Sequence, residues 1–152
     1  MELLIGSALA LLVGIATHAL GMDRERVFYP TVLIVVATYY LLFAAVGNGG
    51  EPLLPELAVA AFFIAAAVWG WRRNLWWVVA GLAGHGLMDA VHHLLVHNAG
   101  VPPSWPGFCM AYDLVAAAWL AWLLQRRGLA AVSPGAAENP AHGTRQTHLG
   151  GH

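Results

Sequence analysis

The chain has 152 residues, of which 59% are hydrophobic and 10% are charged, and its formal net charge is −1 with no lysine. A soluble domain carries about 25% charged residues, so this composition excludes an ordinary water-exposed globule and indicates an integral membrane protein. The near-neutral charge argues against nucleic acid as a partner, and the single cysteine excludes an internal disulfide.

The first apolar segment covers residues 3–21 and ends at the charged sequence MDRER. A secretory signal peptide would have basic residues before an apolar run of about 7–15 residues, whereas here the arginines follow a longer run. We therefore predict a retained transmembrane helix. Four further apolar segments follow, and they cover residues 27–46, 55–71, 74–97 and 106–125. Their lengths are close to the roughly 20 residues that a helix needs to cross a bilayer, although the third must extend through Leu53.

The sequence thus predicts an all-α, polytopic membrane bundle of five transmembrane helices over residues 1–128. Residues 129–152 are rich in glycine, proline and polar side chains and have no apolar period, so we predict a disordered cytoplasmic tail. The histidines of this tail lack the close spacing of a metal-binding motif.

The arginines assign an orientation to the bundle. Three pairs lie between helices one and two, between helices three and four, and after helix five: Arg24 and Arg26, Arg72 and Arg73, and Arg126 and Arg127. Five crossings place all three pairs on one side, which the positive-inside rule makes the cytoplasm. We therefore expect the N-terminus outside, the C-terminus in the cytoplasm, and a location in the bacterial inner (plasma) membrane.

The fourth segment carries an unusual concentration of polar residues, HGLMDAVHHLLVH at residues 85–97. Ionisable groups facing lipid would cost about 2.5–3.5 kcal/mol each, so they should turn into the bundle. At 100° per residue, His85, Asp89 and His92 share one face of the helix with two valines, Val78 and Val96. His93 lies beside Asp89. The opposite face is apolar and should meet lipid: Ala80, Leu87, Val91 and Leu94.

The fifth segment supplies partners for this polar face. Cys109 and Asp113 are four residues apart and share one side of the helix. Because the connecting loop is short, helices four and five should be antiparallel neighbours. At 1.5 Å per residue, the depths of the side chains predict one layer with Cys109 just above it: Asp89, His92, His93 and Asp113.

Imidazoles and carboxylates are suitable ligands for zinc or iron, and a metal would offset the cost of burying the charges. We therefore predict that the four residues of this layer bind a divalent metal. His85 and Asp89 are the predicted catalytic residues, with His85 orienting a ligand or relaying protons. An open coordination position would support hydrolytic or oxidative chemistry on a membrane-soluble substrate.

Other interpretations of the same residues remain open. They climb the helix turn by turn, as the relay of a proton-coupled small-solute permease would. They would also serve a structural subunit by pinning helices four and five together. A haem site would require His18 to face His85. The lipid bilayer is the predicted partner, and so small a bundle is compatible with a homo-oligomer.

The polar residues of segments four and five follow a recognisable order. An HxxxDxxHH segment (His85, Asp89, His92 and His93) is followed by a Pro-rich loop, a cysteine, an aspartate four residues later and a tryptophan: Pro102 or Pro103, Cys109, Asp113 and Trp119. This order resembles a family of small, uncharacterised bacterial integral membrane proteins. The resemblance covers about a quarter of the chain. It implies a shared polar site but no particular activity.

Overall fold

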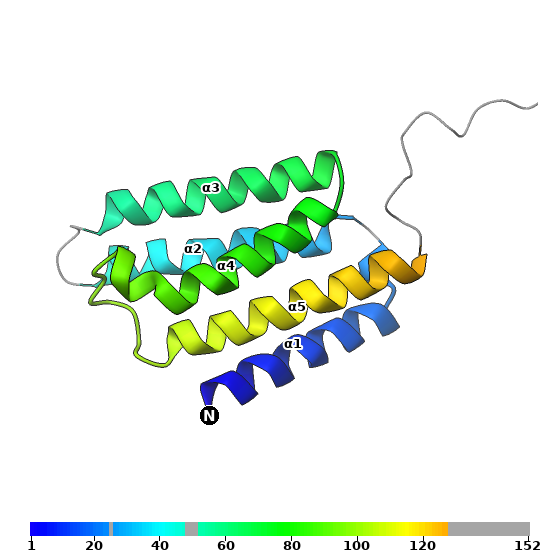
Figure 1. Cartoon of the computed structure of the whole chain (residues 1–152), viewed down its shortest axis with the longest axis horizontal. Helices are drawn as coiled ribbons and strands as arrows, with labels where there is room; N and C mark the ends of the chain where they lie inside the picture. The colour runs from blue at the N-terminus through cyan, green and yellow to red at the C-terminus, as the bar shows by residue number, and fades with distance from the viewer. Residues whose placement is uncertain (25, 48–51, 128–152) are drawn as a thin grey trace, which may run out of the picture.

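The computed structural model describes residues 1–24, 26–47 and 52–127, and this part of the chain is all-α (Figure 1). Its five α-helices are α1 (Glu2–Ala19), α2 (Phe28–Val46), α3 (Leu53–Arg72), α4 (Trp76–Leu95) and α5 (Trp105–Arg127), and a short 3-10 helix, η1 (Met22–Arg24), follows α1. The predicted number of helices is thereby confirmed. The predicted tail, residues 129–152, lies outside the described residues.

The helix ends follow local sequence. Prolines occur in the first turns of α2, α3 and α5 (Pro30, Pro55 and Pro106), where the missing N–H would have no partner within the helix. At the start of α4, the Asn74 side-chain oxygen accepts a hydrogen bond from the backbone N–H of Trp76. This helix ends at Leu95, before the predicted end at residue 97, because Val96 has extended backbone angles.

Four helices, α1, α2, α3 and α5, are long and apolar enough to cross a membrane. The remaining long helix, α4, has the same length as α3, 20 residues, but its histidines and its aspartate make it more polar. Its outer surface is nevertheless apolar, since all four residues that were predicted to face lipid are exposed. Apart from the exposed His93, the ionisable residues of α4 therefore lie on the side that faces the other helices.

The helices lie side by side along the long axis of the molecule (Figure 1). Helix α4 is central, with α5 on one side and α2 and α3 on the other, and α2 packs on α3. Helix α1 packs on the far side of α5. Consecutive helices run in opposite directions, so α4 and α5 are the antiparallel neighbours that the short loop predicts.

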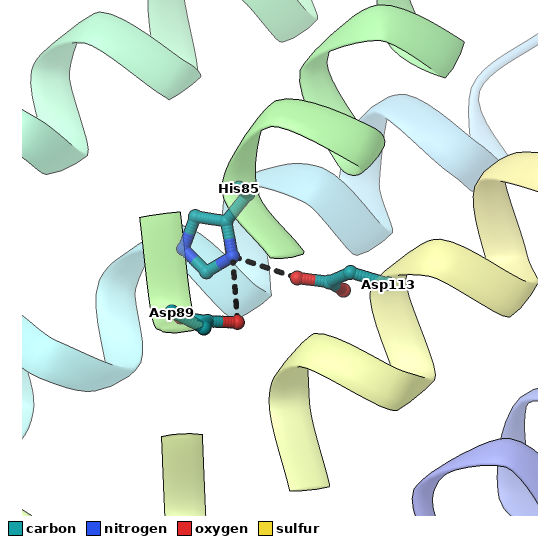
Figure 2. A group of neighbouring side chains, drawn as sticks. All are labelled: His85, Asp89 and Asp113. Atoms are coloured by element: carbon teal, nitrogen blue, oxygen red, sulfur yellow. Dashed lines mark hydrogen bonds and ion pairs between the residues drawn. The ribbon is translucent and has the colours of Figure 1, made fainter. Parts of the chain in front are cut away.

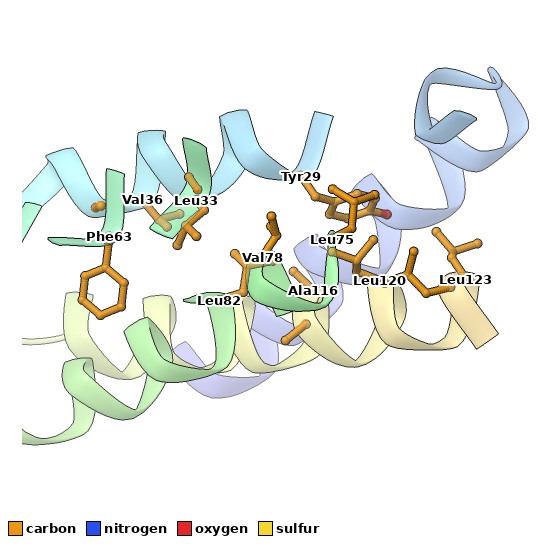
Figure 3. Close-up of a cluster of buried hydrophobic side chains, with 14 residues drawn as sticks. Tyr29, Leu33, Val36, Phe63, Leu75, Val78, Leu82, Ala116, Leu120 and Leu123 are labelled. Atoms are coloured by element: carbon orange, nitrogen blue, oxygen red, sulfur yellow. The ribbon is translucent and has the colours of Figure 1, made fainter. Parts of the chain in front are cut away.

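An apolar core fills the bundle between α2, α4 and α5 (Figure 3). Leu33, Val78 and Leu82 are completely buried in it, and the buried face of α5 continues it through Ala116 and Leu120. This core holds α4 in a fixed rotation about its own axis, and that rotation directs the polar residues of the next two turns into the bundle.

The three arginine pairs belong to helix ends at the same end of the bundle. Arg26 donates a hydrogen bond to the Arg73 carbonyl oxygen at 3.5 Å, so two of the pairs are in contact. Arg73 also lies over the Trp69 ring at 5.2 Å. On α5, Arg126 lies over Trp122 at 4.7 Å. We refer to this end as the arginine end and to the other as the arginine-free end.

Candidate metal centre

Three completely buried polar side chains meet where α4 faces α5 (Figure 2). His85 Nδ1 donates a hydrogen bond to Asp113 Oδ2 at 2.7 Å and lies 3.6 Å from Asp89 Oδ2. Asp89 is one helical turn after His85 on α4, and Asp113 reaches the group from α5. One potential ligand atom from each residue lies within 4.8 Å of the other two. We call these three residues the His/Asp/Asp group.

Several atoms of the His/Asp/Asp group have no hydrogen-bond partner. Both oxygens of Asp89, Oδ1 of Asp113 and Nε2 of His85 are buried without one. No arginine of the described residues forms an ion pair with either aspartate. Two carboxylates and one imidazole therefore share a site that is shielded from solvent. Burying such charges is costly unless a cation compensates them. A divalent cation would neutralise both carboxylates.

Aromatic and apolar side chains enclose the His/Asp/Asp group. The edge of the Phe63 ring meets His85 at a centroid distance of 4.8 Å. The Tyr40 ring lies 6.3 Å from His85, and its hydroxyl interacts with Asp89 without forming a hydrogen bond of standard geometry. Cys109 is buried one turn before Asp113 and close to both carboxylates. This enclosure would strengthen the attraction between a bound cation and the carboxylates, because it keeps the local dielectric low.

His92 belongs to a second polar cluster, nearer the arginine-free end. Its Nε2 donates to Glu56 Oε1 of α3 at 2.9 Å, and the Asn98 amide donates to the same oxygen, also at 2.9 Å. The Asn98 amide also donates to the backbone oxygen of Tyr40 at 3.1 Å. The Tyr40 ring stacks on His92 with a centroid distance of 3.8 Å. We call Glu56, His92 and Asn98 the Glu56 cluster.

The structure brings together some of the predicted metal ligands and separates others. Asp89 and Asp113 meet as predicted, but His85, which was predicted to assist catalysis, occupies the position of a third ligand. His92 is one turn away, paired with Glu56. His93 is exposed, because α2 and α3 cover the His92 side of this turn and leave the His93 side open.

His18 lies in the last turn of α1, at the arginine end, and pairs with Asp23 at 2.7 Å. Its ring contacts Trp119 and Trp122 of α5. His18 and His85 therefore do not face each other, as a haem bound between them would require.

Glu56 is the polar residue that sequence reasoning missed, because a carboxylate near a helix end is usually a solvated interfacial group. The signal lies in the spacing of α3. Glu56 shares one face with small residues and a single phenylalanine, and this is the face that the structure buries: Ala60, Phe63, Ala67 and Gly70. A helix packed through small residues approaches its neighbours closely, so a glutamate on that face must be buried with them.

An apolar cavity of about 370 Å³ lies between α1, α2 and α5. Its walls include Leu9 of α1 and Val35 of α2, both exposed at the surface, so the cavity opens between these two helices. Cys109 and Tyr112 of α5 form its inner side. Because Cys109 also lies close to Asp89 and Asp113, the cavity and the His/Asp/Asp group share a wall.

Comparisons of this chain with family models, with curated proteins and with solved structures found no match. The functional argument therefore depends on the geometry of the chain itself.

Proposed function

We propose that this protein is an integral protein of the bacterial inner membrane that crosses the bilayer with all five helices. Four helices are apolar enough to do so by composition, and the exposed face of α4 is apolar except for His93 near its end. The arginine end carries exposed tryptophans beside its arginines, as the cytoplasmic interface of a membrane protein does. The N-terminus is then outside and the C-terminus inside.

We further propose that the His/Asp/Asp group binds one divalent metal ion, with zinc and iron as the candidates. The observation that carries this proposal is the set of buried and unpartnered carboxylate oxygens around His85. The spacing is compatible with coordination, since the three ligand atoms lie within 4.8 Å of one another and zinc takes nitrogen and oxygen ligands at about 2.0–2.2 Å. Three protein ligands leave a position for water or substrate, as in catalytic zinc sites.

The chemistry that this site supports best is metal-assisted hydrolysis or oxidation of a membrane-soluble substrate. A bound metal of this kind supplies Lewis acidity and an activated water. His85 and Asp89 of α4 and Asp113 of α5 would hold the ion and so link the two helices. The apolar cavity beside Cys109 would admit the apolar part of a substrate from the bilayer, and the surrounding rings would keep bulk water out.

Metal analysis of the detergent-purified protein tests this proposal. We expect about one zinc or iron per chain, and the loss of that metal in the Asp89→Asn and Asp113→Asn variants, since each removes one of three ligands. Glu2→Gln is the matched control, because it neutralises an exposed carboxylate outside the group. Wild-type protein that contains no metal and takes up neither ion after purification would refute the proposal.

A further inference from the structure

Glu56 and His92 do not belong to the set of ligand atoms that lie within 4.8 Å of one another in the His/Asp/Asp group, yet the Glu56 cluster has a feature that simple helix pinning does not explain. Glu56 is 1% exposed, and both of its hydrogen-bond donors, His92 and Asn98, use the same oxygen, Oε1. The other oxygen, Oε2, is buried without a partner. A structural pin would be stronger with both oxygens bonded, so the free oxygen points to a ligand.

The residues of the two clusters lie at increasing depth from the arginine-free end to the His/Asp/Asp group. Glu56 and His92 are each three residues from the end of their helices, about 4.5 Å at 1.5 Å per residue. On α4, Asp89 lies about 9 Å and His85 about 15 Å from the same end by the same rise. His92 and Asp89 are three residues apart, which places their Cβ atoms about 5–6 Å from each other. Oxygen and nitrogen ligands thus follow one another in short steps.

Tyr40 joins the two clusters. Its ring stacks on His92, its hydroxyl interacts with Asp89, and its backbone oxygen accepts the Asn98 hydrogen bond. Electrostatics favours cations at this end, because every arginine of the described residues lies at the opposite end. A carboxylate here meets no competing positive side chain.

We propose that Glu56 and His92 form a transit site for the divalent metal, through which the ion passes from the arginine-free end to the His/Asp/Asp group. This inference rests on the proposed function, since it requires a metal at the inner group. The transit site offers Glu56 Oε1 and Oε2 and the His92 imidazole. Two protein side chains bind a divalent ion more weakly than three, so the ion moves on to Asp89, His85 and Asp113.

The test measures the rate of metal uptake separately from the final occupancy. Metal-free protein is mixed rapidly with Co²⁺, and the absorption of the bound ion is followed in time. We expect Glu56→Gln to slow uptake by about tenfold or more, because negatively charged clefts raise cation on-rates by about 10–10³. The final occupancy should remain that of the wild type, since the inner ligands are intact. Glutamine keeps the oxygen that accepts from His92, so the fold should be preserved.

A second variant and a control make the result decisive. His92→Gln retains a donor to Glu56 and should slow uptake in the same way, and it decides the question if Glu56→Gln does not fold. Glu2→Gln removes an exposed carboxylate at the same end of the bundle, and solvent screens that charge, so uptake should be unchanged. Wild-type uptake rates in both cluster variants, or loss of the final occupancy, would overturn the transit site. A wild-type protein that binds no Co²⁺ at all would instead overturn the metal centre, and the transit site with it.

Discussion

At the scale of single residues, the two aspartates of the His/Asp/Asp group make different contributions to the metal-free protein. Asp113 accepts a short hydrogen bond from His85, whereas neither oxygen of Asp89 has a hydrogen-bond partner. Asp89 is also completely buried. Its contact with His85 is longer than that of Asp113, 3.6 Å against 2.7 Å, so it returns less of the cost of burying the charge, and a bound cation would provide further compensation.

This difference predicts opposite effects of Asp89→Asn with and without metal. In chelator-treated protein, the variant should melt at the same temperature as the wild type or higher, because it removes a buried charge that has only a long contact with His85 and no hydrogen bond. With zinc at 100 times its dissociation constant, the wild type should gain about 2.7 kcal/mol and the variant almost nothing. Thermal unfolding of the purified protein, with and without zinc, measures both effects. If Asp89 only pinned helices together, the variant would be less stable under both conditions.

The sequence was sufficient to predict the polar stripe but not its partners. The helical period correctly orients His85, Asp89 and His92 inward, because ionisable groups that face lipid are costly, but His93 of the predicted layer is exposed. It does not specify which helix covers which edge of the stripe. His92 meets α3 through Glu56, while Asp113 of α5 meets His85, one turn deeper than the predicted layer. Such choices depend on the lateral order of the helices, which no local pattern encodes.

At the scale of helices, α1 depends on α5 for its place in the bundle. The two backbones approach closely at Gly6, where an added Cβ would lie 2.3 Å from the Phe108 carbonyl oxygen. Only glycine allows this approach, since the obstructing atom belongs to the backbone and cannot rotate away. Between helices in a membrane, such close packing is a main source of association energy.

We therefore expect Gly6→Ala to weaken the docking of α1 on α5 by about 1–3 kcal/mol, the usual cost of overpacking. Gly84→Ala is the matched control, because the nearest atom to its Cβ would be a Phe63 ring carbon at an ordinary 3.8 Å. Unfolding of both variants in increasing SDS, followed by far-UV circular dichroism, measures the difference. Equal midpoints for the two variants would show that the α1–α5 approach does not stabilise the bundle.

The helices themselves were predictable because their apolar runs are long and their ends carry strong signals. Prolines in first turns and arginine pairs at the ends confined most boundaries to a few residues. The end of α4 lacks such a signal, since residues 96 and 97 continue the apolar and polar pattern of the helix, and it was predicted two residues too late. The chain leaves the helix at Val96, and Asn98 then reaches the Glu56 cluster, a tertiary contact that a local pattern does not contain.

At the scale of the whole molecule, the decisive question is whether α4 crosses the membrane. The other four helices each contain a stretch long and apolar enough to cross a membrane, whereas the histidines and the aspartate interrupt that of α4. The overall composition is misleading for a helix whose His85, Asp89 and His92 turn inward, because lipid contacts only the exposed face. On α4 that face carries Trp77, Leu87, Val91 and Leu94 along most of its length. The central position of α4 between α3 and α5 also favours the proposed five-crossing arrangement.

Five crossings, with α4 in the membrane, and four crossings, without it, assign each end of α5 to opposite sides of the membrane. Labelling of the two ends therefore distinguishes these topologies. With five crossings and the N-terminus outside, a cysteine at the exposed position Ala99 faces outward and one at Gln125 faces the cytoplasm. We expect a membrane-impermeant maleimide to label Ala99→Cys in intact spheroplasts and Gln125→Cys only after permeabilisation. The parent chain serves as the control, since its buried Cys109 should not react. If α4 did not cross, Ala99 would face inward and Gln125 outward, and the labelling would be reversed. That result would also contradict the five-helix transmembrane arrangement that both proposals require for the Glu56 cluster and the His/Asp/Asp group.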